Sequence, residues 1–279
     1  MSSTDLAAAD KIDWLIRRLR PGWIRNPLAV ALDRYERFAP LRRMDLPEGQ
    51  RLCVIAPHPD DESIGCGGLL RLWTLAGRSA EVLFLTDGAL GSRASRDRNL
   101  PAEMRAAAQR DTAARRRGEA RVALELLGAS AQWLGGRDGN LAADAARLTE
   151  SLAAHWRSHP PDLLAAPFPA DRHGDHAAAA RIVADAAGRA LRADLVMLGY
   201  EVWSPVPANA VLDVTPVAET KWQAIAAHES QVATTDYVSA ARGLGAYRAI
   251  TAGMGPGTAE AFHLAALSDY RALANRLRV

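Results

Sequence analysis

Short apolar runs alternate with longer Ala-rich segments through the middle of the chain. Apolar runs of four to six residues are typical of buried strands, and the segments between them have the length and composition of helices. The predicted strands span residues 52–56, 80–85, 131–134, 163–166 and 195–198, and the predicted helices span residues 66–76, 101–127, 142–156 and 176–191. This alternation predicts an α/β fold: a Rossmann-like, doubly wound, mostly parallel sheet in three α/β/α layers.

The pattern weakens after residue 199, where it predicts a strand over 210–214 and a helix over 216–228 and leaves the remainder mixed. It does not give the order of the strands. Before residue 51, arginines between apolar residues indicate amphipathic segments at 12–19 and 28–38. We therefore predict an N-terminal helical extension, residues 1–50, followed by a single domain, residues 51–279.

The extension contains tryptophans as well as arginines, a composition that suits peripheral contact with a membrane surface. Helices packed against the domain with their arginines outward are the more common alternative. The sequence contains no uninterrupted run of about 18 apolar residues, the length needed to span a bilayer. The polar start of the chain does not have the pattern of a secretion signal, so we expect a cytoplasmic protein.

The composition is that of a globular protein, with 49% hydrophobic and 24% charged residues. The net charge is +2, and arginines are interspersed with acidic residues, so no nucleic-acid partner is expected. The two cysteines, Cys53 and Cys66, do not form a thiolate metal motif. The oligomeric state is unknown from these features.

A dense polar cluster, His58-Pro59-Asp60-Asp61-Glu62, directly follows the first predicted strand. Loops at the carboxyl ends of strands carry the ligands of open α/β sheets. Carboxylates this close repel one another unless a cation compensates their charge. The cluster therefore indicates a metal site.

A second polar cluster, from Asp171 through His173 and Asp175 to His176, follows the fourth predicted strand. Catalytic zinc sites commonly combine His nitrogens with a carboxylate oxygen and keep one position open for water. We predict one zinc ion per chain, with other divalent metals as alternatives. Its predicted ligands are His58, Asp61 and His176.

The neighbours of these ligands have predicted roles in catalysis. Asp60 would be the general base, and His173 would stabilise an oxyanion or protonate a leaving amine. Asp175 would orient His173 or a metal ligand, although an Asp here also fits a simple helix cap.

With these motifs, the sequence resembles the LmbE-like (PIG-L) family of zinc-dependent N-deacetylases over roughly residues 51–190. The likeness includes Gly65-Cys66-Gly67-Gly68, Leu85 to Gly88, Arg116 with Glu119, Gly135 to Gly139, and His173 to His176. It implies the same zinc ligands and the same base, and it places Arg116 and Asp138 in contact with the substrate. From the residues alone, Arg116 equally fits a solvated helix face and Asp138 an ordinary turn.

The resemblance implies a hydrolase that removes an N-acetyl group from a GlcNAc-type amino sugar or glycoconjugate, breaking a linear amide bond and releasing acetate. The substrate would be a small-molecule or lipid-linked amino sugar. Some family members carry a Tyr where this chain has Asp171, and His228 or Gln231 could approach the acyl group. The alternative is a nucleotide- or carbohydrate-binding Rossmann-like module without catalysis. A dinucleotide fingerprint fails, however, because Leu70 occupies the position of its third glycine.

Overall fold

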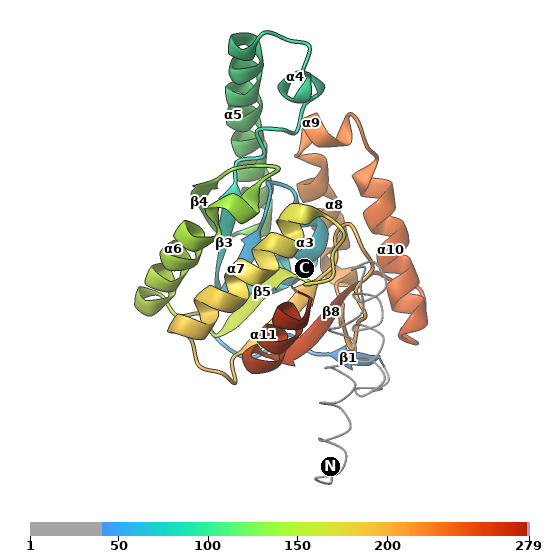
Figure 1. Cartoon of the computed structure of the whole chain (residues 1–279). Helices are drawn as coiled ribbons and strands as arrows, with labels where there is room; N and C mark the ends of the chain where they lie inside the picture. Colours follow the sequence, from blue (N-terminus) through green and yellow to red (C-terminus); the bar gives the residue numbers. More distant parts are fainter. Residues whose placement is uncertain (1–40, 278–279) are drawn as a thin grey trace.

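The computed structural model describes residues 41–277, and the amphipathic segments predicted at 12–19 and 28–38 lie outside them. Within the described residues, one eight-stranded sheet runs through the domain and helices cover both of its faces (Figure 1). Along the sheet the strands follow the order β1-β7-β8-β6-β5-β2-β3-β4. Their bounds are β1 (Arg42–Met44), β2 (Arg51–Ala56), β3 (Ser79–Thr86), β4 (Ser130–Gly136), β5 (Leu163–Pro167), β6 (Val196–Tyr200), β7 (Ala210–Asp213) and β8 (Ala259–Ala266).

The predicted doubly wound, mostly parallel sheet is confirmed. All neighbouring strands pair in parallel except β8, which is antiparallel to both β6 and β7. The five strands predicted before residue 199 and the strand predicted at 210–214 are present, with ends that differ by one or two residues. The strand β1 falls inside the predicted N-terminal extension and pairs with β7, so the described end of that segment belongs to the sheet.

Side chains of successive strand residues point to opposite faces, which gives the sheet two apolar sides. In β2, Cys53 and Ile55 pack toward one layer of helices, while Leu52 and Val54 pack toward the other. The first layer consists of α6 (Ala145–Ser158), α7 (Gly174–Ala190) and α11 (Leu267–Arg276). The second contains α3 (Asp61–Leu75), α5 (Ala102–Leu127) and α8 (Ala218–Ala226).

The described residues contain three further α-helices: α4 (Arg93–Arg96), α9 (Glu229–Val232) and α10 (Tyr237–Thr251). Figure 1 shows α4 and the start of α5 projecting from the body of the domain, with α9 beside them and α10 along one side. Among residues 41–277, no helix combines the length and the apolar character needed to cross a membrane.

The glycine-rich stretch after the first motif lies inside α3, which begins five residues earlier than predicted. A Cβ on Gly65 would lie 2.3 Å from the Tyr200 ring, and one on Gly68 would lie 2.4 Å from Val214. These glycines therefore allow α3 to pack closely against its neighbours. They do not form a phosphate-binding loop, so this feature no longer supports a nucleotide-binding module.

The switch point of the sheet lies between β2 and β5. The chain runs from β2 outward through β3 and β4, and then returns to place β5 on the other side of β2. Loops that leave the carboxyl ends of two such strands diverge and open a crevice. The two polar clusters predicted from the sequence follow β2 and β5, so the topology brings them together.

Candidate active site

The first cluster forms a tight turn between β2 and α3. Asp60 is the one described non-glycine residue with a positive φ, at +130°. Its N–H donates to the Glu62 carboxylate over 2.9 Å, and its carbonyl accepts from Ser63 and Ile64 as α3 begins. Strained backbone of this kind persists only where surrounding contacts hold it, and it concentrates at functional sites.

The Asp61 carboxylate lies close to the imidazoles of both His58 and His176. The Asp61 Oδ2 atom lies 3.3 Å from His58 Nδ1 and 3.3 Å from His176 Nε2. Two atoms that each lie about 2.1 Å from one tetrahedral zinc ion are about 3.4 Å apart. Each of these two separations matches that of two ligands of one zinc ion. Among residues 41–277, however, the groups whose ligand atoms all lie within 4.8 Å of one another are His58 with His173 and His176, and His58 with Asp138 and Asp175.

His176 gives an independent test of this fit. The residue is fully buried, yet neither of its ring nitrogens has a hydrogen-bond partner among the described residues. Buried polar atoms without partners are costly and rare in folded proteins. A metal ion at Nε2 would satisfy this ring where the protein atoms do not.

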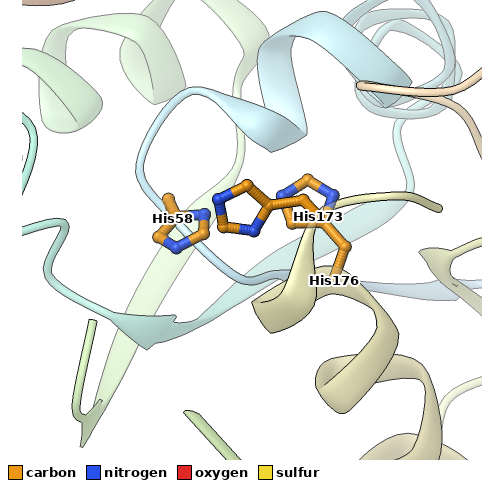
Figure 2. Close-up of side chains that lie close together, drawn as sticks. All are labelled: His58, His173 and His176. Carbon is orange, nitrogen blue, oxygen red and sulfur yellow. The ribbon is translucent and has the colours of Figure 1, made fainter. Parts of the chain in front are cut away.

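His173 lies beside both imidazoles, and Figure 2 shows the three rings together, with His173 and His176 coming from the start of α7. The His173 ring centroid is 5.1 Å from that of His58 and 4.9 Å from that of His176. Candidate ligand atoms of the three histidines lie within 4.8 Å of one another. The geometry therefore also offers His173, in place of Asp61, as a third metal ligand.

The hydrogen bonds of His173 favour a different role. Its Nδ1 accepts the backbone N–H of Asp175 over 3.3 Å, so the neutral ring carries its proton on Nε2. Burial, together with the nearby His58 and His176, lowers the pKa of His173 and favours this neutral form. Since His173 also lines the pocket, its Nε2–H is available as a donor there.

Two carboxylates contact the other side of the His58 ring. The Nε2 atom lies 3.2 Å from Asp175 Oδ2 and 3.2 Å from Asp138 Oδ1. Burial lowers the pKa of His58, but Asp138, Asp175 and Asp61 outweigh it and raise that pKa well above its usual value. Asp175 thus contacts His58, one of the predicted metal ligands.

Asp175 and Asp138 also hold the surrounding loops. Asp175 accepts the N–H groups of Gly139 over 2.7 Å and of Leu141 over 3.0 Å, and Asp138 accepts that of Leu90 over 2.7 Å. Asp138 faces both His58 and the pocket, so it is not an ordinary surface turn residue.

Arg116 is buried against the predicted base. Its Nη2 lies 3.0 Å from Asp60 Oδ2, and the guanidinium also donates to the carbonyls of Pro59 and Gly88. The alternative that Arg116 belongs to a solvated helix face is therefore wrong. Burial raises the pKa of Asp60 to about 6, with Arg116 opposing the rise and Asp61 adding to it.

A pocket of about 390 Å³ opens directly over these groups, a size in the range of small-molecule sites. Its lining comprises the predicted site residues, among them His58, Asp60 and His173, which we call the reactive side, and a second set of residues, which we call the wall side. The sequence prediction missed most of the wall side, which includes Leu90, Arg96, Val202, Trp203, Thr234, Thr235 and Tyr237. No motif signals these residues.

The two residues proposed to approach an acyl group differ in their positions. Gln231 lines the pocket, whereas His228 is buried behind it, with its Nε2 atom 3.1 Å from Glu62 Oε1. Because Glu62 holds the backbone of Asp60, His228 supports the turn that carries the base.

Comparison with known families gives a match between residues 53–187 and the PIG-L family model, described as GlcNAc-PI de-N-acetylase. The chain is also 33% identical over 115 residues to a 1D-myo-inositol 2-acetamido-2-deoxy-alpha-D-glucopyranoside deacetylase from Kineococcus radiotolerans. That match covers 38% of this chain and only 30% of the relative.

Solved structures share the fold over most of the chain. One is the N,N'-diacetylchitobiose deacetylase from Pyrococcus horikoshii, with a TM-score of 0.65 and 23% identity, covering 81% of this chain and 89% of that one. Another is GalB, a 4-carboxy-2-hydroxymuconate hydratase from Pseudomonas putida, with a TM-score of 0.63 and 24% identity, covering 77% and 95%. Because these two proteins catalyse different reactions, the shared fold does not by itself decide the chemistry.

Proposed function

We propose that the chain, which matches the PIG-L family model over residues 53–187, is a zinc-dependent N-deacetylase. It hydrolyses the acetamide of a GlcNAc-type amino sugar, free or linked to a larger molecule, and releases acetate and a free amine. One observation carries the proposal: Asp61 Oδ2 lies 3.3 Å from imidazole nitrogens of both motifs, next to a buried carboxylate that faces the same pocket.

His58, Asp61 and His176 would hold the metal, because Asp61 lies close to both imidazoles and His176 Nε2 has no hydrogen-bond partner among the described residues. When bound, a zinc ion polarises a carbonyl oxygen and lowers the pKa of a water molecule. Asp175 and Asp138 orient His58 from its far side, as carboxylates commonly do for metal-binding histidines.

Asp60 acts as the general base that removes a proton from the attacking water and then delivers it to the leaving amine. Arg116 keeps the Asp60 carboxylate in place and favours its ionised form. The Nε2–H of His173 donates to the carbonyl oxygen as negative charge develops on it. Trp203 and Tyr237 provide an aromatic wall on which the sugar ring packs.

A binding module without catalysis fits these contacts less well. Such a module has no use for a strained backbone that presents a buried carboxylate to the pocket, and strain of this kind is a cost to stability. A hydratase, the chemistry of one structural relative, is distinguished by its product, since hydration of a double bond releases no acetate.

The test is acetate release by the purified full chain after metal analysis and zinc loading. The panel comprises free N-acetylglucosamine, its 1-phosphate, a chitobiose and an N-acetylglucosaminyl inositol, with Asp60→Ala as the matched control. We expect zinc in both proteins and acetate only from the unsubstituted chain. Equal acetate release by Asp60→Ala, or none from any N-acetyl amino sugar, would contradict the proposal.

A further inference from the structure

Asp171 connects the two sides of the pocket through one buried carboxylate. Its side chain is 1% exposed and lies in the loop between β5 and α7. The Oδ1 atom accepts the N–H of His173 over 2.9 Å, and the Oδ2 atom accepts the N–H of Trp203 over 3.1 Å. The same Oδ2 atom lies 3.5 Å from Nδ1 of His176.

His176 is the ionisable side chain that faces the Asp171 carboxylate. Within residues 41–277, Asp171 lies within ion-pair distance of His176, and no lysine or arginine pairs with it. Backbone N–H donors stabilise a carboxylate, but a buried charge without a cation remains unfavourable. A metal ion held at His176 Nε2 would supply the compensating positive charge, with the neutral ring between it and Asp171.

The arrangement around His176 parallels that around His58. In each imidazole, one nitrogen faces Asp61 Oδ2 and the other faces a carboxylate: Asp175 for His58 and Asp171 for His176. Carboxylates at this position fix the tautomer and the ring orientation of metal-binding histidines. The contact of His176 with Asp171 is long for a hydrogen bond, and its Nδ1 has no other partner.

Trp203 links this carboxylate to the substrate side. Its ring stacks on His173 with centroids 6.1 Å apart and meets Tyr237 edge-on, also at 6.1 Å. Trp203 lines the pocket and is 39% exposed. Because packing covers only part of the side chain, the anchoring of its backbone matters for where the ring lies. The N–H that anchors this backbone is the one donated to Asp171 Oδ2.

We propose that Asp171 is a positioning residue that orients His176 for the metal and holds the backbone of Trp203 at the pocket. Metal binding at His176 then fixes the position of Trp203. The inference rests on the proposed zinc site. A metal-bound imidazole is a stronger N–H donor, so zinc shortens the contact between His176 Nδ1 and Asp171 Oδ2. The Trp203 N–H then has a fixed acceptor.

The first experiment measures zinc affinity by competition with a chromophoric chelator. The variant is Asp171→Asn, which keeps the size of the side chain and removes its charge. Ser204→Ala is the matched control, since Ser204 Oγ accepts the N–H of Arg172 and so ties together the same two loops without contacting His176. We expect a loss of about tenfold or more in zinc affinity for Asp171→Asn. The control should stay within about twofold of the unsubstituted protein.

The second experiment follows Trp203 by fluorescence during zinc titration. The chain has seven tryptophans, so the signal of Trp203 is obtained by difference from Trp203→Phe. We expect zinc to change this signal in the unsubstituted protein and not in Asp171→Asn at saturating zinc. Unchanged zinc affinity in Asp171→Asn, an equal loss in Ser204→Ala, or a Trp203 signal indifferent to zinc overturns the inference.

A measurement without substitutions covers the case in which Asp171→Asn fails to fold. In the zinc-loaded unsubstituted protein labelled with ¹⁵N-histidine, the His176 Nδ1–H should give an exchange-protected resonance, and its absence overturns the inference. An unsubstituted protein that binds no zinc and releases no acetate instead refutes the proposed function. If the unsubstituted protein binds zinc but the expected effects of Asp171→Asn on zinc affinity and on the Trp203 signal are absent, only the role of Asp171 is refuted.

Discussion

The two sides of the pocket come from parts of the chain that differ in how they encode function. The reactive side consists of short polar motifs after β2 and β5, with His58, Asp60 and His176 held in fixed positions by neighbouring carboxylates and by Arg116. The wall side comes largely from segments after β6, where Trp203 and Tyr237 contribute shape and aromatic surface. Chemistry requires particular groups at close spacing, whereas a wall requires only size and contact. Substitutions on the two sides should therefore affect different constants.

The largest effect is expected from removing metal ligands. Asp61→Ala and His176→Ala should each lose most of the bound zinc and reduce kcat by more than about a thousandfold, because the metal and the general base act together. His173→Ala should keep zinc and lose about a hundredfold in kcat, as expected for one lost oxyanion donor. Metal analysis and acetate release measure both. Zinc loss in His173→Ala with zinc retained in Asp61→Ala would show that the three histidines form the site instead.

Removing the cation beside the base should have the next largest effect. Arg116→Met leaves the Asp60 carboxylate buried without its partner, and a misplaced base costs about a hundredfold in kcat. The free energy of unfolding should fall by about 3 kcal/mol, as for other broken buried ion pairs. Urea denaturation and acetate release measure the two effects. Arg116→Lys is the control and should recover part of each, and equal activity in Arg116→Met would exclude a role for Arg116 in holding the base.

On the wall side, Trp203→Ala should raise KM about tenfold, which corresponds to about 1.4 kcal/mol of lost binding. Zinc content should not change, and kcat should change less than about threefold, because the backbone N–H to Asp171 remains. Tyr247→Ala is the matched control, an aromatic residue on α10 that is 60% exposed and lies outside the pocket lining. A fall in kcat without a change in KM would mean that Trp203 belongs to the reactive side.

The same contrast explains what could be predicted from the sequence. The parallel strands and the meeting of the two polar loops were predictable, because buried strands have a distinct pattern and the carboxyl ends of neighbouring parallel strands lie together. The antiparallel strand β8 was missed, since half of its residues are alanines, which have little preference for strands. The helix α10 was missed because Gly243 and Gly245 disfavour helices, although Gly245 is needed where a Cβ would lie 2.7 Å from Thr258 Cγ2.

The start of α3 was predicted too late for a related reason. Asp61 and Glu62 interrupt the apolar pattern, yet acidic residues in a first helical turn are favourable next to the helix dipole. The burial of Arg116 could not be predicted either, because the run Arg115-Arg116-Arg117 gives no sign of which arginine turns inward. Only the packing of α5 over the turn after β2 places Arg116 beside Asp60.

The smallest expected effect concerns the strain stored on the reactive side. Asp60 holds a φ of +130°, which glycine adopts without the penalty that a Cβ imposes. Because both Asp60→Gly and Asp60→Ala remove the base, neither should release acetate, yet Asp60→Gly should be more stable by about 1 kcal/mol in urea denaturation. The same pair of substitutions at Asp97, where φ is −73°, is the control and should give the opposite order, since glycine there only adds freedom to the unfolded chain. If Asp60→Ala proved as stable as Asp60→Gly, the turn after β2 would not be strained. The reactive side would then be held in place by its charged contacts alone.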